Sequence, residues 1–208
     1  MRGRFISFEG PEGGGKSTHV AALAEALRAE GKAVLVTREP GGTRLAELIR
    51  GLVREELEDP PVTRAEVLLF LASRAQVVAN VIKPALARGE WVLCDRFSDS
   101  TFAYQGYGRG IDVQLLKELN EFATEGLVPD LTILLDVPLE VSRARLAERQ
   151  RATAAAADRI EAAADRIESA LAGGTTATKS SGLTIAKKPM PLARIAISSE
   201  CRQKLHIV

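Results

Sequence analysis

A stretch of glycines followed by a lysine is the first part of the sequence with the composition of a binding site. Residues 10–17 read Gly-Pro-Glu-Gly-Gly-Gly-Lys-Ser and fit the pattern G-x-x-x-x-G-K-[ST]. Glycines let the backbone curl so that its N–H groups point at phosphate oxygens, Lys16 can reach the β- and γ-phosphates, and the Ser17 hydroxyl can ligate Mg²⁺. A chance match in a Gly-rich turn is the alternative, but a strand pattern precedes the motif and an amphipathic helix pattern follows it. In this segment, the phosphate loop, we expect a nucleoside triphosphate to contact Gly10, Pro11, Glu12, Gly13, Gly14, Gly15, Lys16, Ser17 and Thr18.

Two arginines stand at the ends of predicted strands and could form a second anion site. Arg38 lies in Thr-Arg-Glu-Pro-Gly-Gly-Thr at 37–43, and Arg96 lies in Asp-Arg-Phe-Ser at 95–98. A guanidinium holds phosphate through two parallel hydrogen bonds, which fixes orientation as well as charge. A single surface arginine is more often a solvated side chain than a ligand, but two at strand ends beside a phosphate loop favour a ligand role. Asp95 could orient Arg96 or hold a Mg²⁺-bound water.

The surrounding motifs narrow the class of reaction. The sequence has no Asn/Thr-Lys-x-Asp motif, which a GTPase would use to read its base. Leu134-Leu135-Asp136 fits the strand end of a P-loop ATPase only weakly, because Val137 follows where such an ATPase typically has glutamate. A small kinase needs no water-activating residue, but it needs a second anion site facing the first, since phosphoryl transfer depends mostly on positioning and charge stabilisation.

Short apolar runs and helical patterns alternate along the chain, as in an α/β fold. Strands are expected at 4–9, 33–37, 91–95 and 131–136, with a further short strand at 192–197. Helices are expected at 16–30, 45–53, 63–87, 111–123, 138–149 and 151–171. Near-continuous apolar strands separated by helices predict a central parallel sheet with helices on both faces. Ligands bind such sheets beyond the carboxyl ends of the strands, and the predicted strands end in Glu9, Arg38, Asp95 and Asp136.

The longest helical pattern, at 63–87, carries boundary signals of its own. Thr63 and Glu66 have the spacing of a capping box, in which Thr63 would be the N-cap. Pro84 lies near the end of the pattern and could kink the helix there.

The overall composition is that of an ordinary globular domain. The chain has 208 residues, of which 46% are hydrophobic, and its formal net charge of +1 gives no reason to expect nucleic-acid or membrane binding. Two cysteines are too few for a disulfide framework, and Cys94 lies in an apolar run that favours a buried hydrophobe. No uninterrupted apolar stretch is long enough to cross a bilayer, and the N-terminus lacks a secretory signal pattern, so a cytoplasmic location is expected.

Five motifs, in order along the chain, resemble those of thymidylate kinase. They are Phe8-Glu9-Gly10 with the phosphate loop, the 37–43 motif, Glu-Val-Leu-Leu-Phe-Leu-Ala-Ser-Arg at 66–74, Asp95-Arg96-Phe97, and Thr-Phe-Ala-Tyr-Gln-Gly at 101–106. The resemblance covers about residues 4–161. It implies a P-loop NTPase fold of the α/β class, a homodimer, and phosphorylation of dTMP to dTDP with ATP and Mg²⁺. Ser17 and Asp95 would serve the metal.

The resemblance also implies which side chains act on the phosphate groups. Arg38 and Arg96 would hold the dTMP phosphate, and Arg96 and Lys16 would take part in catalysis. Glu12 would approach the 3′-hydroxyl of the acceptor or the metal environment, and it too is expected to act in catalysis.

A second set of residues would bind the nucleoside of the acceptor. The resemblance implies that Phe70 stacks on the thymine ring, that Arg74 hydrogen-bonds a thymine carbonyl, and that Thr101 and Gln105 complete base reading. Tyr104 would pack under the sugar and disfavour a 2′-hydroxyl. From the pattern alone, core packing is favoured for Phe70, which lies in a helical apolar stripe with Val67 and Leu71, and Tyr104 could equally be a core residue.

Charge that develops on the transferred phosphoryl group calls for a cation delivered as the site closes. Some members of the family place that arginine in the phosphate loop, whereas others have glycine there and supply arginines from a mobile lid. Gly13 makes this sequence similar to the second, bacterial kind, with the lid at about residues 145–160. Arg149 and Arg151 are the expected catalytic arginines, and an exposed basic helix face is the alternative.

The resemblance ends near residue 161. We expect residues 1–171 to form a nucleoside monophosphate kinase domain and residues 172–208 to form an atypical tail, disordered or altered, because this region is rich in Gly, Thr and Ser. An altered reading frame and genuine divergence both stay open as its origin. Two other functions are therefore considered: a different pyrimidine nucleotide or nucleoside kinase, and a nucleotide-binding protein whose catalysis the tail impairs.

Overall fold

A five-stranded sheet forms the centre of the protein. The computed structural model describes residues 3–54, 57–153 and 194–197. The strands are β1 (Phe5–Glu9), β2 (Val34–Arg38), β3 (Trp91–Asp95), β4 (Leu131–Asp136) and β5 (Arg194–Ile197). Their order across the sheet is β2-β3-β1-β4-β5, in which β1 to β4 run parallel and β5 pairs antiparallel with β4. The expected parallel sheet is thus confirmed for its four main strands, and the short strand expected near the C-terminus adds to its edge in the opposite direction.

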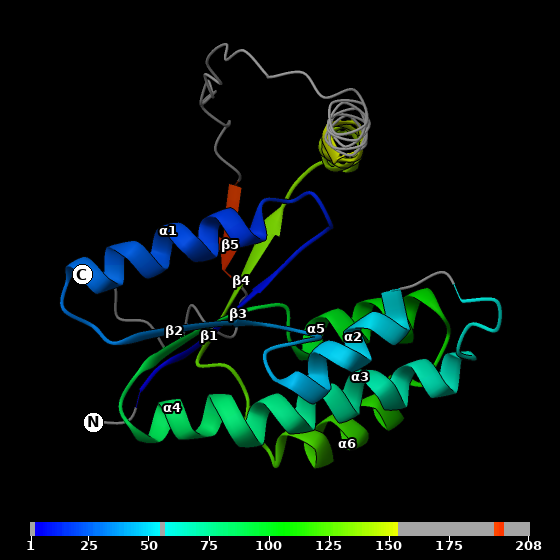
Figure 1. Ribbon diagram of the computed structural model, residues 1–208, viewed down its shortest axis with the longest axis horizontal. Coiled ribbons are helices and arrows are strands. Elements are labelled where there is room, and N and C mark those ends of the chain that lie inside the picture. The colour runs from blue at the N-terminus through cyan, green and yellow to red at the C-terminus, as the bar shows by residue number, and fades with distance from the viewer. Residues whose placement is uncertain (1–2, 55–56, 154–193, 198–208) are drawn as a thin grey trace, which may run out of the picture.

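Helices cover both faces of this sheet, as the alternating pattern predicts. The α-helices are α1 (Lys16–Ala29), α2 (Arg44–Arg54), α3 (Thr63–Val77), α4 (Lys83–Ala87), α5 (Ser98–Thr101) and α6 (Val113–Thr124). Two π-helical segments, η1 (Val78–Ile82) and η2 (Phe102–Gly108), continue α3 and α5, and residues 139–153 form a further helix. In Figure 1, α1 lies on one face of the sheet, while α3, α4 and α6 lie on the other with α2 beside α3.

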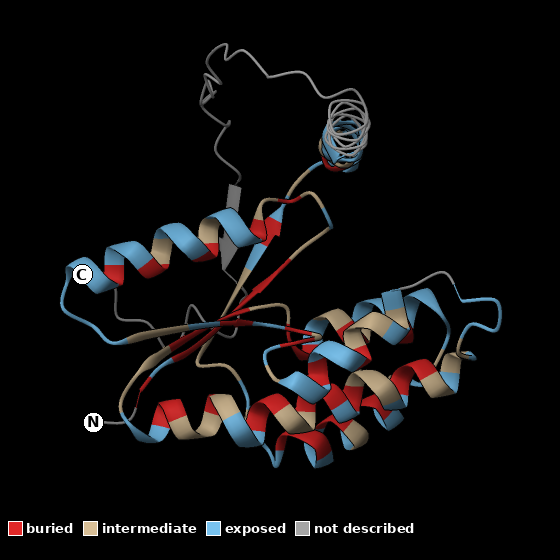
Figure 2. Cartoon of the chain, in the orientation of Figure 1, coloured by how far each residue is buried: buried red, intermediate tan, exposed pale blue. Residues whose placement is uncertain are grey.

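The middle of the sheet is dry because helices pack on both of its sides. All five residues of β1 are buried, and so are the three central residues of β3 (Figure 2). On the α1 face, Ile6, Phe8 and Leu93 pack against the apolar side of the helix. Full burial of one such side chain contributes about 1.5–3 kcal/mol, so these two strands form a rigid base for the loops that follow them.

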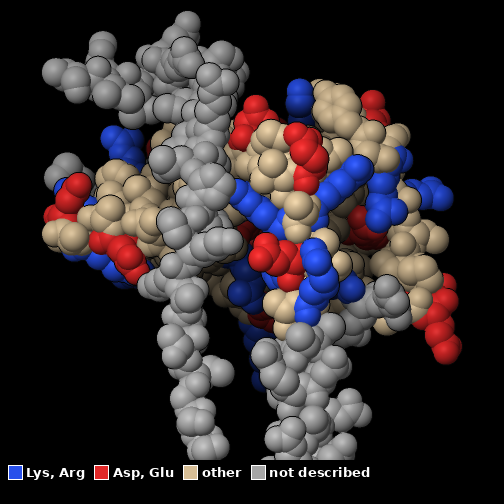
Figure 3. Space-filling model, turned by 90° about the horizontal axis from the view of Figure 1, so that it is seen from above, with Lys and Arg blue, Asp and Glu red and all other residues tan. Residues whose placement is uncertain are grey.

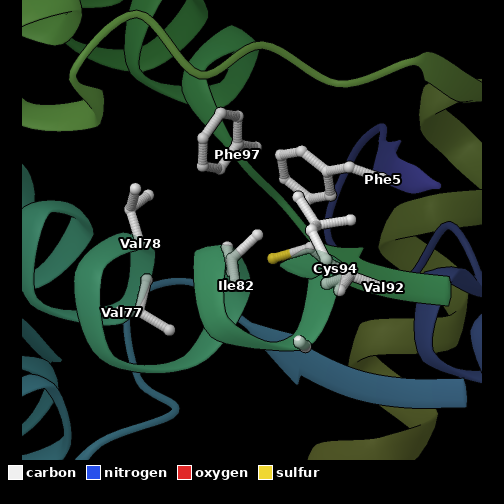
Figure 4. Close-up of a cluster of buried hydrophobic side chains, with 9 residues drawn as sticks. Phe5, Val77, Val78, Ile82, Val92, Cys94 and Phe97 are labelled. Carbon is white, nitrogen blue, oxygen red and sulfur yellow. The ribbon is translucent and has the colours of Figure 1, made fainter. Parts of the chain in front are cut away.

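On the opposite face, a second buried cluster ties the long helix to the sheet. Figure 4 shows side chains from α3, η1, β1 and β3 meeting around Phe5 and Phe97. The two rings are 4.9 Å apart between centroids and meet edge to face at 86°. Cys94 belongs to this cluster and is buried, as expected, and burial raises the pKa of its thiol well above the ordinary value. Because Phe97 follows Arg96 directly, the cluster fixes the chain where a predicted site residue leaves the sheet.

The start of α3 differs from the expected capping box. Thr63 is the first helical residue and Val62 is the N-cap, which makes no side-chain cap hydrogen bond. The Glu66 side chain turns to Gln105 and Arg109 and does not reach back to the helix end. Further along, the π-helical segment η1 precedes Pro84, where a wider turn accommodates the missing proline N–H and the bulk of its ring.

The continuous helix Thr63–Ala87 is also apolar enough, with a mean hydropathy of 1.5, to span a membrane by length and composition alone. A core helix of a soluble protein meets the same criteria. Its buried residues Val77, Val78 and Ile82 face the sheet in the cluster around Phe5, and this packing accounts for part of the apolar composition.

The parallel register brings the charged strand ends to one edge of the sheet. Asp95 lies beside Phe8 on one side and beside Arg38 on the other. Glu9 follows Phe8 and pairs with Leu134 of β4. The expected gathering of ionisable side chains beyond the strand ends is therefore present. Most of the helix expected at 151–171, and most of the tail at 172–208, lie outside the described residues.

Candidate active site

The phosphate loop joins β1 to α1, and glycines with positive φ shape it. Gly13 and Gly15 have φ values of 77° and 88°, and Gly10 has 135°. A Cβ atom at Gly10 would lie 2.6 Å from the carbonyl oxygen of Leu135, so only glycine lets the loop pass this close to β4. Because α1 begins at Lys16, the first N–H groups of the helix lie at the loop, where they and the helix dipole favour an anion.

Lys16 places its ammonium group inside the curl of this loop. Its Nζ donates to the carbonyl oxygens of Gly10 at 3.0 Å and Pro11 at 2.8 Å. Burial lowers the pKa of Lys16, and the charge of Arg96 lowers it further, while nearby carboxylates led by Asp95 oppose the change. A phosphate group in the loop would replace these weak neutral partners by charged oxygens.

Ser17 and Asp95 connect the start of α1 to the end of β3. The Ser17 hydroxyl donates to Asp95 Oδ2 at 2.7 Å. Hydroxyl and carboxylate oxygens are ligands that Mg²⁺ prefers, and Mg²⁺ in nucleotide sites takes few protein ligands because it keeps water and phosphate oxygens. Within the described parts of the chain, no group of three or more His, Cys, Asp or Glu side chains could hold a metal alone. The pair therefore fits a Mg²⁺ that arrives with a nucleotide.

Arg96 occupies an unusual backbone conformation at the end of β3. Its φ of 73° lies in the left-handed region, which costs a residue other than glycine about 1–3 kcal/mol and persists only when the surroundings enforce it. Its N–H donates to the Phe8 carbonyl at 2.9 Å. Its Nη1 donates to Ser100 Oγ at 3.0 Å, and its guanidinium carbon lies 5.2 Å from the centre of the Tyr104 ring. These contacts enforce the strained conformation and hold the guanidinium in a defined place at the sheet edge.

Arg38, at the end of β2, is oriented by a carboxylate on α2. Its Nη2 donates to both oxygens of Glu47, at 3.1 and 3.0 Å. Glu47 also accepts from the N–H of Gly42 at 2.9 Å. The Gly42 hydrogen bond lowers the pKa of Glu47, and the interaction with Arg38 adds to that effect against the opposing effect of burial.

Glu9, the last residue of β1, is buried directly before the phosphate loop. It accepts hydrogen bonds from the Phe97 N–H at 2.7 Å and the Ser100 hydroxyl at 2.6 Å. Burial raises the pKa of Glu9 to about 7, and the two hydrogen bonds only partly oppose that rise. Because Ser100 also accepts from Arg96, Glu9 reaches that guanidinium through one hydroxyl.

Arg74 is the centre of a buried polar network. It is 2% exposed, and its Nε donates to Glu39 Oε2 at 2.7 Å. Its terminal nitrogens donate to Asn120 Oδ1, to the Phe97 carbonyl and to Thr101 Oγ1, at 2.8 to 3.1 Å. A guanidinium has five N–H donors, so one, on Nη1, is left for another acceptor. Burial raises the pKa of Glu39, and Arg74 opposes that rise.

The other side chains expected to bind the acceptor nucleoside surround the same space. Phe70 is half-buried on the cavity wall, while its neighbour Leu71 belongs to the buried cluster between α3 and α6. Tyr104 is 49% exposed, so it is not a core residue. Thr101 and Gln105 are buried but reach the cavity, and Gln105 donates to Glu66 at 2.8 Å.

The helix at 139–153 is docked on the phosphate loop. Ser142 donates through its hydroxyl to the carbonyl oxygen of Glu12. Arg149 Nη2 donates to Glu12 Oε1 at 2.9 Å. Burial alone would raise the pKa of Glu12, but the Arg149 hydrogen bond and the surrounding arginine charges outweigh it and lower the pKa. Arg151 instead donates to the carbonyl of Ala147 in its own helix, at 3.2 Å.

These groups enclose one cavity of about 1040 Å³, here called the central cavity. Figure 3 shows basic and acidic side chains gathered together on the face seen from above. The expected site residues that line the cavity are Glu12, Gly13, Gly15, Lys16, Ser17, Thr18, Arg38, Phe70, Arg74, Asp95, Arg96, Thr101, Tyr104, Gln105 and Arg149. Gly10, Pro11 and Gly14 shape the phosphate loop without lining the cavity, and Arg151 does not line it either.

Several cavity residues were not identified from the sequence. Arg50 and Arg54 lie one turn apart on α2 and both line the cavity, where Arg50 donates to the Pro40 carbonyl at 2.7 Å. Their spacing of four residues could have indicated this, because it places both arginines on the same face of a helix. Glu66 and Arg109 also line the cavity and form an ion pair at 2.7 Å, which no local pattern predicts.

Comparison with known proteins shows which family the chain is similar to. A family model described as thymidylate kinase matches residues 8–162. The thymidylate kinase of Alcanivorax borkumensis is 54% identical over 161 residues, which are 77% of this chain and 75% of that protein. That of Pelotomaculum thermopropionicum is 50% identical over 161 residues, 77% and 73% of the two chains. The crystal structure of thymidylate kinase from Ehrlichia chaffeensis matches with a TM-score of 0.62 and 39% sequence identity, covering 74% of this chain and 87% of that one. The chain therefore belongs to the thymidylate kinase family.

Proposed function

We propose that this enzyme transfers the γ-phosphoryl group of ATP to the phosphate of dTMP and releases dTDP and ADP. The observation that carries the proposal is the central cavity, whose wall contains both the phosphate loop and the guanidinium groups of Arg38 and Arg96. A phosphate oxygen of dTMP forms the new bond to the γ-phosphorus, and the bond from that phosphorus to the β–γ bridging oxygen breaks. Such a transfer needs both phosphates in line, which two anion sites on one cavity can provide.

On the donor side, the loop amides and Lys16 would bind the β- and γ-phosphates. Ser17 and Asp95 would hold Mg²⁺, which when bound offsets the charge of the phosphate oxygens. The buried setting of Lys16 strengthens its attraction for phosphate, because less water screens the charge. Glu12 would act near the acceptor sugar or the metal, and Arg149 would leave Glu12 to reach the transferred phosphoryl group.

On the acceptor side, Arg38 and Arg96 would hold the dTMP phosphate. Their support by Glu47 and Ser100 fixes the direction of each guanidinium before substrate arrives, which limits the entropy lost on binding. The half-buried Phe70 ring would stack on the thymine. Tyr104 would pack under the sugar.

The base edge of the acceptor would meet three buried polar groups. These are the last N–H of Arg74, the hydroxyl of Thr101 and the amide of Gln105. A site built from buried hydrogen-bonding groups rejects ligands that leave those groups unpaired, often by a factor of about 10⁴. Recognition of thymine by such a set is the reason to prefer dTMP to other acceptors.

The test is an assay of purified protein with ATP, Mg²⁺ and a panel of nucleoside monophosphates. Rapid turnover of dTMP, with kcat/KM at least about a hundredfold above dCMP, dAMP and dGMP, is expected. A preference for another pyrimidine would identify the second kinase function. ATP binding without transfer to any acceptor would identify a nucleotide-binding protein with impaired catalysis.

We further propose that the enzyme acts as a cytoplasmic homodimer. On α3, Leu68 is 59% exposed, and on α6, Phe122 is 86% exposed, although these two helices pack side by side. An exposed apolar face of this kind is typical of a protein–protein interface. Light scattering after size exclusion should give twice the chain mass for the wild type and the single mass for Phe122→Glu. A wild-type monomer at micromolar concentration would contradict the homodimer.

A further inference from the structure

A buried carboxylate holds the amide of Gln105 in the wall of the central cavity. Gln105 Nε2 donates to Glu66 Oε1 at 2.8 Å, and both side chains are buried, at 4% and 9% exposure. The other oxygen of Glu66, Oε2, pairs with Arg109 Nη2 at 2.7 Å. Both oxygens of Glu66 are thus engaged, and the carboxylate sits in one orientation between η2 and the residue that follows it.

This contact settles which end of the amide faces which way. A carboxylate only accepts hydrogen bonds, whereas a glutamine amide can both donate and accept. The amide nitrogen of Gln105 must therefore point to Glu66, and its oxygen must lie on the other side of the group. Among the described residues, none donates to Gln105 Oε1, and Gln105 lines the central cavity. The atom offered to a ligand is an acceptor.

We propose that Glu66 is a positioning residue that makes the enzyme select thymine and uracil over cytosine. It does so by presenting Gln105 Oε1 to the N3 position of the acceptor base. Thymine and uracil carry an N–H at N3, which can donate to that oxygen. Cytosine carries a lone pair there, so two acceptors would face each other and a buried polar group would stay unpaired. This inference rests on the proposed function, because it concerns the base of the same acceptor.

The experiment must separate this effect from that of Arg74, whose remaining N–H also favours a carbonyl over an amino group at the neighbouring position. We therefore compare two acceptors, dTMP and 5-methyl-dCMP, which share the methyl group, sugar and phosphate. The variant is Glu66→Gln, which keeps the shape of the side chain but can donate as well as accept. Gln105 can then turn its amide, while Arg74 is left unchanged.

Wild-type enzyme should use dTMP at least about a hundredfold better than 5-methyl-dCMP in kcat/KM, and it should also accept dUMP. In Glu66→Gln this preference should fall about tenfold or more, with a raised KM for dTMP and a gain for 5-methyl-dCMP. A merely structural role of Glu66 would lower kcat/KM for both acceptors by the same factor. An unchanged ratio in the variant would overturn the proposal.

A matched control is available on the surface of the protein. Glu118 accepts from Gln114 Nε2 at 3.1 Å on the exposed side of α6, so Glu118→Gln makes the same chemical change in a Glu–Gln pair outside the cavity. It should leave the ratio of the two acceptors within about twofold. The ratio is measured in one preparation, so a smaller fraction of folded enzyme does not alter it.

The outcomes also separate this inference from the proposed function. Wild-type enzyme that phosphorylates no monophosphate would overturn both. Wild-type enzyme that is active on dTMP, with a Glu66→Gln ratio that does not move, would overturn the role of Glu66 alone. If Glu66→Gln does not fold, Glu66→Asp is assayed in its place, because the shorter carboxylate withdraws from Gln105 Nε2 and should also lower the preference for dTMP over 5-methyl-dCMP; an unchanged kcat/KM ratio would overturn the proposal.

Discussion

Replacement of Arg74 by methionine would remove one buried ion pair and three further hydrogen bonds from the wall of the central cavity. Breaking a buried pair by deleting one partner costs about 3–5 kcal/mol, because the remaining charge stays unpaired. Each of the other three acceptors would lose its donor at about 1–3 kcal/mol, although such losses are not additive. We expect Arg74→Met to lower the free energy of unfolding by at least about 5 kcal/mol, which is comparable with the whole stability of many domains.

The partner variant makes this prediction specific to the ion pair. Glu39→Gln keeps an oxygen that can accept from Arg74 and should cost only about 1–3 kcal/mol. The double variant should be more stable than Arg74→Met, because it no longer buries an unpaired carboxylate. The deficit of Arg74→Met should also grow between pH 5 and pH 8. Without Arg74 the pKa of Glu39 rises further, so ionisation at high pH is more costly.

Urea unfolding followed by the fluorescence of Trp91, the single tryptophan, measures all three variants. The assay should be run at pH 8, where an unpaired Glu39 is most costly. If adding Glu39→Gln to Arg74→Met gave no gain in stability, or if Arg74→Met lost less than about 1 kcal/mol, the buried pair would not hold this pocket together.

Three further predictions concern Glu9, Gly13 of the phosphate loop and Arg149 of the helix at 139–153. The pKa of Glu9 is raised from 4.5 to about 7, so the wild type should lose up to about 3 kcal/mol of stability relative to Glu9→Gln as pH rises through that range. The difference between the urea midpoints of the two proteins measures this loss, and an equal difference at pH 5 and pH 8 would contradict it. Gly13→Ala should cost about 1–2 kcal/mol and speed hydrogen exchange in residues 139–153, because its Cβ would lie 2.7 Å from the Ser142 carbonyl; unchanged exchange would show that the helix does not rest there. Arg149→Ala should lower kcat about a hundredfold yet change the melting temperature little, since its ion pair is exposed, and a full kcat would remove its assigned role.

The sheet and its charged edge could be predicted because their signals are local. Each of the four parallel strands is a short apolar run, and the strand ends carry Glu9, Arg38 and Asp95 in the sequence itself. Parallel pairing then brings those ends together without further information. The phosphate loop could be predicted for the same reason, because its glycines and Lys16 lie within eight consecutive residues.

The partners of buried polar residues could not be predicted in this way. Glu66 has the spacing of a capping residue, but α6 packs against both α3 and η2, and this arrangement brings Glu66 to Gln105, 39 residues away. Arg74 was expected only as a base-reading group. Its four hydrogen bonds reach Glu39 just after β2, Phe97 just after β3, Thr101 of α5 and Asn120 of α6, and they depend on how those elements meet. Periodicity indicates which face of a helix is buried, but it does not say which distant side chain lies there.

The claim that an arginine-lined anion site faces the phosphate loop is tested most directly by Arg96→Ala, with ATP binding and phosphoryl transfer measured on the same preparation. Arg88→Ala is the control, because Arg88 is exposed at the end of α4 and pairs with Glu90 outside the central cavity. We predict that Arg96→Ala loses a factor of about 10³ in transfer to dTMP while its Kd for ATP stays within about threefold of the wild type. Retained transfer, or a loss of ATP binding as large as the loss of transfer, would contradict the account.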